Sequence, residues 1–253
     1  MKRSGNTILI TGGGSGIGAA LAQRFHDAGN TVIVAGRRRD ALEATIAGRP
    51  NLHAMVLNID SPEAIEAFAR DLLAAHPSLN ILINNAGIMQ HEDIDTRRDL
   101  AGTEATIATN LLGPIRLINA LVDHLKAQAN AAIVNVTSGL AFVPLPAAAT
   151  YSATKAAIHS YTVSLRDILA GQVEVIEMAP PATQTDLTPG QSSRAGYQPL
   201  EEFADEVFAL FGQTPTPREI LVERVKFLRY AEMEGRYDAA LVAITELATG
   251  DGH

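Results

Sequence analysis

The segment Thr7-Ile8-Leu9-Ile10-Thr11-Gly12-Gly13-Gly14-Ser15-Gly16-Ile17-Gly18 decides the fold of this chain. Its first four residues form an apolar run typical of a buried strand, and the apolar residues after Gly16 recur with the 3.6-residue period of a helix. Glycines at 12, 16 and 18 keep Cβ atoms out of the intervening turn, so that backbone N–H groups can approach a pyrophosphate. A glycine-rich turn without a ligand is the alternative, and a second strand-helix unit behind the turn argues against it.

Short apolar runs alternate with helical patterns along the chain, which indicates βαβ units and a parallel sheet. We expect strands at residues 8–10, 31–35, 52–57, 81–83, 132–136 and 173–178. Helices are expected after Ser61, at about 103–126 with a kink at Gly113-Pro114, and at about 150–170, 200–211 and 236–247. Residues 220–222 fit either a seventh strand or part of a helix.

The pattern predicts an α/β chain with one doubly wound Rossmann-type domain over residues 1–253. Its parallel sheet would have six or seven strands, with helices on both faces. Within that domain, residues 181–253 would supply a substrate loop and the C-terminal helices.

Composition excludes several kinds of protein. The 253 residues carry a formal net charge of −8 and include no cysteine. The acidic balance makes nucleic acid and anionic membranes poor partners, and the lack of cysteine excludes disulfides and thiolate-bound metals. No stretch approaches the ~18 uncharged apolar residues of a spanning helix, and the opening residues do not resemble a signal peptide. We expect a cytoplasmic protein with no bound metal, in which His91, His124 and His159 form no ligand cluster.

Three side chains at fixed spacing indicate proton transfer. Ser138 ends the apolar run that begins at Ile133, Tyr151 follows thirteen positions later, and Lys155 lies four residues beyond Tyr151. Because residues four apart share a helix face, a phenol and an ammonium would lie together near the hydroxyl. Each residue alone could be an ordinary core or strand-end residue. Combined with the glycine turn, the three predict hydride transfer on an alcohol or ketone.

The end of the second predicted strand, Val34-Ala35-Gly36-Arg37-Arg38-Arg39-Asp40, bears on the cofactor. An acid at this tip would bind the ribose 2′-hydroxyl of NAD, whereas an arginine accommodates the 2′-phosphate of NADP. No acid stands at the tip, and Arg37 and Arg38 offer forked donors suited to phosphate. NADP is therefore expected and NAD is less favoured. A solvated basic turn without a ligand is the alternative.

In its motifs the chain resembles the short-chain dehydrogenase/reductase family. The matching residues are Thr11-Gly-x-x-x-Gly16-x-Gly18, Asn84-Asn85-Ala86-Gly87, Asn110, Ser138, Tyr151-x-x-x-Lys155 and Pro180-Pro181-x-x-x-Thr185, in this order. The runs at 77–85, 135–142 and 223–230 are similar to a bacterial subgroup labelled for D-alanine esterification of lipoteichoic acid.

The resemblance implies roles for the matching residues. Tyr151 would be the acid/base, with its pKa lowered by the Lys155 ammonium and the positive nicotinamide. Ser138 would hold the substrate oxygen, and Asn110 would bend its helix and hold a water linked to Lys155. The implied cofactor site comprises Gly12, Ser15, Gly16, Ile17, Gly18, Arg37, Arg38, Asn58, Ile59, Asn85, Ala86, Gly87, Tyr151, Lys155, Pro181, Thr183 and Thr185. Asn58 stands where the family usually has aspartate, and Pro181 where it usually has glycine.

The residues expected beside the substrate are apolar, which favours a small to medium hydrophobic secondary alcohol or ketone. They are Met89, Leu140, Phe142, Leu145 and Leu187. Two alternatives remain: a cofactor-binding sensor without turnover, and an enzyme of cell-envelope D-alanylation. A sensor need not keep the three polar residues, and D-alanylation requires a charged substrate.

Residues 180–199 are typical of a long loop, which we expect to be a mobile lid over the substrate. The family resemblance further implies a homodimer or homotetramer. The subunits would associate through the helices expected at about 103–126 and 150–170.

Overall fold

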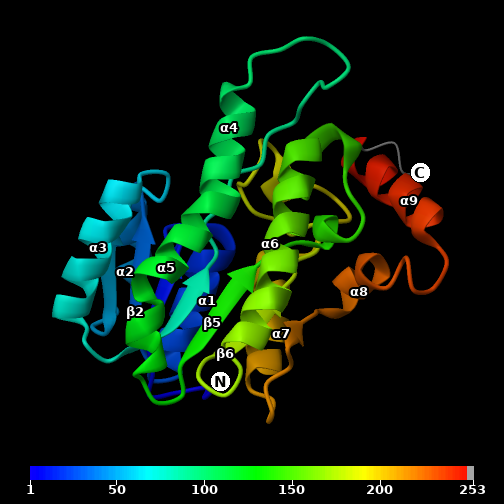
Figure 1. The fold of residues 1–253 in the computed structure, drawn as a ribbon. Helices are drawn as coiled ribbons and strands as arrows, with labels where there is room; N and C mark the ends of the chain where they lie inside the picture. Colours follow the sequence, from blue (N-terminus) through cyan, green and yellow to red (C-terminus); the bar gives the residue numbers. More distant parts are fainter. Residues whose placement is uncertain (250–253) are drawn as a thin grey trace.

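The computed structural model describes residues 1–249, and its centre is a seven-stranded parallel sheet (Figure 1). The strands are β1 (Thr7–Thr11), β2 (Thr31–Gly36), β3 (Leu52–Val56), β4 (Leu79–Asn84), β5 (Ala132–Val136), β6 (Glu174–Met178) and β7 (Glu219–Ile220). Their order is β3-β2-β1-β4-β5-β6-β7, with every neighbouring pair parallel. The doubly wound Rossmann fold is confirmed, and the undecided run near residue 220 forms a short strand.

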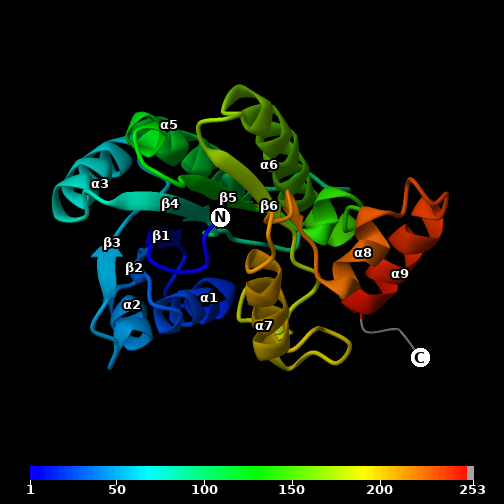
Figure 2. The ribbon, with the colours of Figure 1, turned by 90° about the horizontal axis from the view of Figure 1, so that it is seen from below.

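Helices cover both faces of the sheet (Figure 2). One face carries α1 (Gly16–Asp27), α2 (Arg39–Ile46) and α7 (Leu200–Phe211), and the other carries α3 (Pro62–Ala75), α5 (Gly113–Lys126) and α6 (Ala149–Ile168). Helix α4 (Ala101–Ile107) leads towards α5, while α8 (Glu223–Arg229) and α9 (Tyr237–Thr249) lie beyond the β7 edge. The patterns above did not predict α2 and α8, because helices of eight and seven residues are too short to show a clear period.

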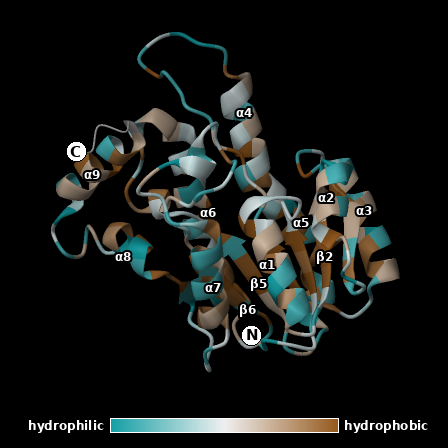
Figure 3. Ribbon diagram, turned by 180° about the vertical axis from the view of Figure 1, so that it is seen from behind, coloured by the Kyte–Doolittle hydropathy of each residue, from teal (hydrophilic) through white to brown (hydrophobic). Residues whose placement is uncertain are grey.

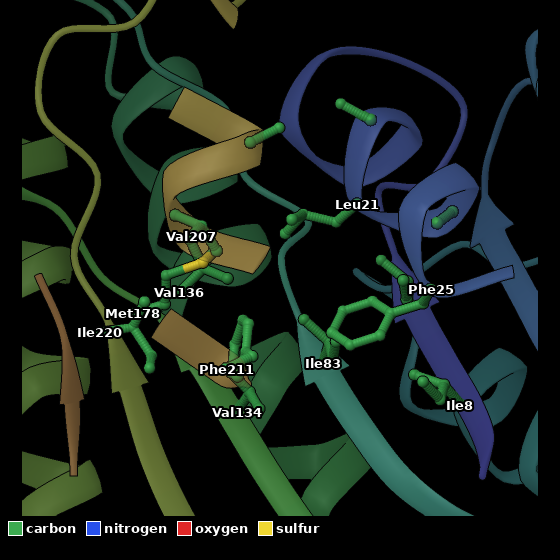
Figure 4. Close-up of a cluster of buried hydrophobic side chains, with 14 of the residues drawn as sticks. Ile8, Leu21, Phe25, Ile83, Val134, Val136, Met178, Val207, Phe211 and Ile220 are labelled. Atoms are coloured by element: carbon green, nitrogen blue, oxygen red, sulfur yellow. The ribbon is translucent and has the colours of Figure 1, made fainter. Parts of the chain in front are cut away.

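Side-chain alternation along the strands divides the core into two halves. In β1, Ile8 and Ile10 join the cluster under α1 and α7, whereas Leu9 faces the cluster under α3 and α5. Figure 4 shows the first cluster, where Phe25 of α1 and Phe211 of α7 lie 5.6 Å apart between ring centroids. Because both faces are covered, most strand residues are apolar, and much of the sheet is brown in Figure 3.

Two local signals explain how the helices begin and bend. The Ser61 hydroxyl accepts a hydrogen bond from Ala64 N at 3.1 Å, which is the expected cap of α3. Between α4 and α5 the chain forms a π-helical turn over Ala108–Leu112. The irregular turn therefore lies just before Gly113-Pro114, and a Cβ on Gly113 would stand 2.7 Å from Ile59 Cγ1. This glycine permits close packing against the loop after β3.

One helical run among the described residues, Ala101–Lys126, is long and apolar enough to cross a membrane by length and composition alone. This differs from the expectation that no stretch approaches a spanning helix, because α4, the π-helical turn and α5 form one continuous run. Its residues Leu117, Leu121 and Leu125 are fully buried and pack against the sheet. Such packing is that of a core helix in a globular fold.

Candidate active site

The glycine turn after β1 has the geometry that its sequence predicts. Gly12 has a φ of +67°, and a Cβ there would lie 2.8 Å from Ala86 Cα. Gly16 has a φ of +52°, a conformation that glycine adopts without strain. A Cβ on Gly18 would lie 2.4 Å from the Gly12 carbonyl oxygen and 2.5 Å from Asn85 Nδ2. Gly18 thus permits helix-to-turn packing and does not line the cavity described next.

A cavity of about 420 Å³ opens at the carboxyl ends of the strands. Among the residues predicted to hold the cofactor, those that line it are Gly12, Ser15, Gly16, Ile17, Arg37, Arg38, Ile59, Asn85, Ala86, Gly87, Tyr151, Lys155, Pro181, Thr183 and Thr185. Asn58 does not line it: its side chain is exposed and accepts a hydrogen bond from Asp60 N at 3.3 Å. Lining residues outside the predicted set of cofactor residues are Thr11, Ala35, Gly36, Leu57, Ile88, Thr109, Val136, Thr137, Pro180, Asp186 and Gln191.

Thr11 has a role that the sequence pattern did not suggest. Its hydroxyl oxygen accepts hydrogen bonds from the backbone N–H groups of Asn85 and Ala86, each at 3.0 Å. The Asn85 side chain in turn donates to Thr11 O at 2.9 Å and to Gly12 O at 3.3 Å. These bonds tie the end of β1 to the end of β4 at the point where the strand order reverses.

The two arginines stand at the β2 end of the cavity. Arg38 Nη2 donates to Ser15 Oγ at 3.4 Å, and Arg37 Nη1 lies 3.6 Å from Asp60 Oδ2. The Arg37 side chain is 58% exposed, so its pairing with Asp60 is weak and screened by solvent. Among the residues that the structure describes, Asp186 in the loop after β6 is the one acid that lines the cavity, and Arg37 and Arg38 make the tip of β2 positively charged.

Ser138, Tyr151 and Lys155 meet at the opposite end of the cavity. Ser138 follows β5, and its hydroxyl accepts a hydrogen bond from Leu140 N at 3.1 Å and is hydrogen-bonded to the Tyr151 phenol. Lys155 Nζ donates to Val136 O at 2.8 Å and lies 5.5 Å from the centroid of the Tyr151 ring. All three side chains are buried, with exposures of 8%, 8% and 4%. The spacing of the sequence therefore does bring these groups together.

Burial dominates the proton affinities of this pair. It raises the pKa of Tyr151 to about 12, although the hydrogen bond with Ser138 acts in the opposite direction. It lowers the pKa of Lys155 to about 8, because a buried ammonium loses hydration. At neutral pH the free protein therefore holds a protonated phenol beside a lysine close to its titration range. The expected depression of the Tyr151 pKa involves the positive nicotinamide as well as Lys155, and it stays a prediction for the complex with the cofactor.

Asn110 lies in the π-helical turn and fastens the loop after β4. Its Oδ1 accepts from Ile88 N at 2.9 Å and its Nδ2 donates to Ile88 O at 2.9 Å. A further bond joins Nδ2 to Thr154 Oγ1 at 3.3 Å on α6. Asn110 is almost fully buried and stands behind Gly87, whose added Cβ would lie 3.4 Å from Asn110 Oδ1.

Three predicted substrate residues gather beside Tyr151. Leu145 belongs to a buried cluster with Ala148 and Tyr151, against which Met89, Leu140 and Ala248 of α9 pack. Leu187 lines the cavity from the loop after β6.

Phe142 lies elsewhere: it follows the 3-10 turn Gly139–Ala141 and belongs neither to this cluster nor to the residues that line the cavity. Its ring lies 5.0 Å from that of His159 and 4.7 Å from the Arg229 guanidinium carbon. The structure therefore does not bring Phe142 to the site.

The loop over residues 180–199 is held by internal hydrogen bonds. Gln191 Nε2 donates to Thr183 O at 2.8 Å and to Thr185 Oγ1 at 3.1 Å, and its Oε1 accepts from Thr188 Oγ1 at 2.9 Å. Arg194 Nη1 donates to the carbonyl of Ala248 at 2.9 Å, which joins the loop to α9.

His159 belongs to a cluster with two glutamates that the sequence did not indicate, and neither His91 nor His124 is part of it. Its Nδ1 lies 2.8 Å from the fully buried Glu177 carboxylate, and ligand atoms of His159, Glu177 and Glu219 lie within 4.8 Å of one another. Thr137 donates to Glu177 at 2.7 Å and Arg229 to Glu219 at 2.9 Å. Because both carboxylates already have proton donors, we describe the cluster as an ion-pair network.

Comparison with known proteins shows the family of the chain. A model of short chain dehydrogenases matches residues 6–196. The chain is a short-chain dehydrogenase. It is 40% identical to "Uncharacterized oxidoreductase DltE" of Bacillus subtilis over 91% of this chain and 93% of the relative. It is 34% identical to sulfoacetaldehyde reductase 2 of Chromohalobacter salexigens over 72% and 74%.

A solved structure shares the whole fold of this short-chain dehydrogenase. It is a short chain dehydrogenase of Burkholderia cenocepacia in complex with NADP, with a TM-score of 0.82 and 25% identity over 97% of this chain and 99% of that one. Membership of the family makes the protein an oxidoreductase that acts on CH–OH groups with a nicotinamide cofactor.

Proposed function

We propose that this short-chain dehydrogenase prefers NADP and interconverts hydrophobic secondary alcohols and ketones. One observation carries the proposal: a single cavity of about 420 Å³ joins the glycine turn and two arginines to Ser138, Tyr151 and Lys155. A dinucleotide in that cavity would extend from the arginines to the three polar groups. The nicotinamide cofactor supplies or accepts the hydride when it is bound.

The residues present fit a dinucleotide phosphate. The side chain of Ser15, at the N-terminus of α1, makes no capping hydrogen bond, so the first N–H groups of the helix are left to a ligand. Gly12 and Gly16 bring the backbone close enough for this contact. Arg38 and Arg37 would bind the 2′-phosphate of NADP, because β2 ends in arginines and not in an acid. Asp60, in the loop after β3, pairs with Arg37 only at 3.6 Å.

Tyr151 would act as the acid/base and Ser138 would hold the substrate oxygen by a hydrogen bond. The raised pKa of Tyr151 keeps the phenol protonated at neutral pH, so it carries the proton that a carbonyl oxygen needs during reduction. Lys155 would keep a positive charge next to the phenol and stabilise the phenolate left after that donation. Its own pKa of about 8 leaves it protonated at neutral pH.

The substrate side of the cavity supports a neutral, apolar substrate. Apart from Lys155, the cations that line the cavity are Arg37 and Arg38 at its far end. The name of the Chromohalobacter reductase indicates a sulfonated substrate for that protein. Among the described residues that line the cavity here, the arginines are Arg37 and Arg38, at the end away from Tyr151. The same argument disfavours D-alanylation, and the intact Ser138, Tyr151 and Lys155 disfavour a sensor without turnover.

We further propose a cytoplasmic homodimer or homotetramer. Leu112 in the turn before α5 and Val163 on α6 are exposed apolar side chains, as is Ile107 at the end of α4. A second subunit that covered these residues would remove them from water. Light scattering should give at least twice the chain mass of 26.8 kDa at micromolar concentration, and a monomer would contradict the proposal.

The decisive experiment is a ketone screen. Acetophenone, 2-octanone and cyclohexanone are offered with NADPH and with NADH, and loss of cofactor absorbance is followed. We expect reduction with NADPH preferred, and a loss of at least ~10²-fold in turnover for Tyr151→Phe, the usual contribution of acid/base catalysis. No reduction of any ketone, or a Phe variant near the parent rate, would refute the assignment.

A further inference from the structure

The helix that carries Tyr151 and Lys155 begins without a cap of its own. Its N-cap residue is Ala148, which has no side-chain acceptor, and its first turn contains no acid. A helix start needs partners for its first N–H groups, and a cap normally provides one within the same segment. In α6 that partner comes from a distant part of the chain.

Glu92 supplies the missing cap. Its Oε2 accepts a hydrogen bond from Thr150 N at 2.7 Å, and its Oε1 accepts one from the Thr150 hydroxyl at 2.8 Å. Its backbone N–H donates to Ala147 O at 2.9 Å, so the two segments are joined on both sides of the helix start. Thr150 is followed directly by Tyr151.

The carboxylate is also tied to α4 and to its own loop. Glu92 Oε1 accepts from Thr103 Oγ1 at 2.9 Å and from Arg98 Nη2 at 3.0 Å. Burial would raise the pKa of Glu92, but the donors together hold it at about 2. Glu92 is therefore ionised throughout the working range of pH. Between residues 90 and 100, Glu92 and Arg98 are the only side chains that are not exposed.

We propose that Glu92 is a positioning residue of the reaction, acting through Thr150 on Tyr151. Four hydrogen bonds to one partly buried carboxylate fix the first turn of α6, and the phenol leaves the helix from that turn. Displacement of a catalytic group by about 1 Å is enough to lower a rate by orders of magnitude. The carboxylate thus sets where the proton is held without touching the substrate.

The test compares Glu92→Ala and Glu92→Gln with the control Asp93→Ala, an exposed acid on the same loop. Turnover is measured with NADPH and acetophenone, or the fastest ketone of the screen, and NADPH binding is measured separately by fluorescence. We expect Glu92→Ala to lose at least about 10-fold in kcat with NADPH affinity changed less than about 3-fold. Glu92→Gln, which keeps one acceptor, should fall between, and Asp93→Ala should match the parent.

Unchanged kcat in Glu92→Ala, or an equal loss of kcat and of NADPH binding, would overturn the proposal, because both outcomes mean a purely structural role. If the alanine variant does not fold, the same two criteria apply to Glu92→Gln.

Amide exchange of residues 147–155 gives a readout that is independent of substrate. Exchange must be faster in the Glu92 variant than in Asp93→Ala, and equal rates refute the cap. The inference rests on Tyr151 as the acid/base, so Tyr151→Phe is assayed in parallel. An active Phe variant refutes the proposed function, whereas an inactive Phe variant with an active Glu92→Ala refutes only the role of Glu92.

Discussion

Replacement of Gly18 by alanine should destabilise the protein, although alanine is the better helix former. In an ordinary helix interior the change would stabilise by about 1 kcal/mol. Here the new Cβ would lie 2.4 Å from the Gly12 carbonyl oxygen and 2.5 Å from Asn85 Nδ2. Overpacking costs about 1–3 kcal/mol, and loss of the Asn85 bonds to the turn adds about 1 kcal/mol. The net expectation is a loss of about 1–3 kcal/mol, together with weaker cofactor binding.

Gly102 provides a matched control. It lies in α4, and an added Cβ would be only 2.2 Å from Gln90 Oε1. That atom is the end of a flexible, exposed side chain that can rotate away, whereas the neighbours of Gly18 belong to a hydrogen-bonded turn. Gly102→Ala should therefore leave the free energy of unfolding unchanged or raise it by up to about 1 kcal/mol.

Urea denaturation gives the free energy of unfolding of the parent and of both variants. Titration with NADPH shows whether the glycine turn still binds the cofactor. If Gly18→Ala is as stable as the parent, the turn accommodates the added Cβ and our prediction is wrong. If both variants lose the same free energy of unfolding, the rigidity of the neighbouring atoms does not decide the cost of the added Cβ.

Three further predictions concern the cofactor, pH and the loop. Arg38→Ala should weaken NADPH by about 10-fold or more through loss of one charge-assisted hydrogen bond; NADH should be unaffected, and equal losses in fluorescence titrations would contradict a 2′-phosphate contact. The hydrogen bond to Glu177 raises the pKa of His159. The stability that this pair adds should therefore be present below the unfolded histidine pKa of ~6.5 and disappear as pH rises through the folded value. The Tm difference between the parent and His159→Gln should shrink across that range, and a constant difference would argue against the ion pair. Amide exchange of residues 181–199 should slow when NADPH and a ketone bind, whereas protection that is already complete in the free protein would mark a fixed arm.

The sheet could be predicted because its signals are local. Each of the first six strands is a short apolar run, and each alternates with a helical pattern of its own. Strand β7 could not be decided because it has two residues and exists only by pairing with β6. A run that short carries no periodicity, and its conformation depends on the neighbour.

The same distinction separates the predicted from the unpredicted site residues. Tyr151 and Lys155 are one helical turn apart, so spacing alone brings them together. Glu92 lies 58 residues from its partner Thr150, and nothing in its local pattern marks it as a cap. Phe142 was expected at the substrate because it is apolar and near Ser138, but it follows a 3-10 turn and does not line the cavity. Residues one helical turn apart remain neighbours in the folded protein, so their proximity can be predicted from spacing. The direction of a side chain after a turn cannot be predicted from residue type alone.

The apolar groups around the substrate end are separate from the core of the sheet. Leu145, Ala148 and Tyr151 form one small cluster with Met89, Leu140 and Ala248 around it, and it shares no buried residue with the two large clusters under the helices. Mutations of Met89, Leu140 and Ala248 therefore leave the buried residues of both large clusters unchanged. Under the proposed function, substrate selectivity can then change without rebuilding the sheet, and a mutant library confined to these three residues should yield altered selectivity among well-expressed variants.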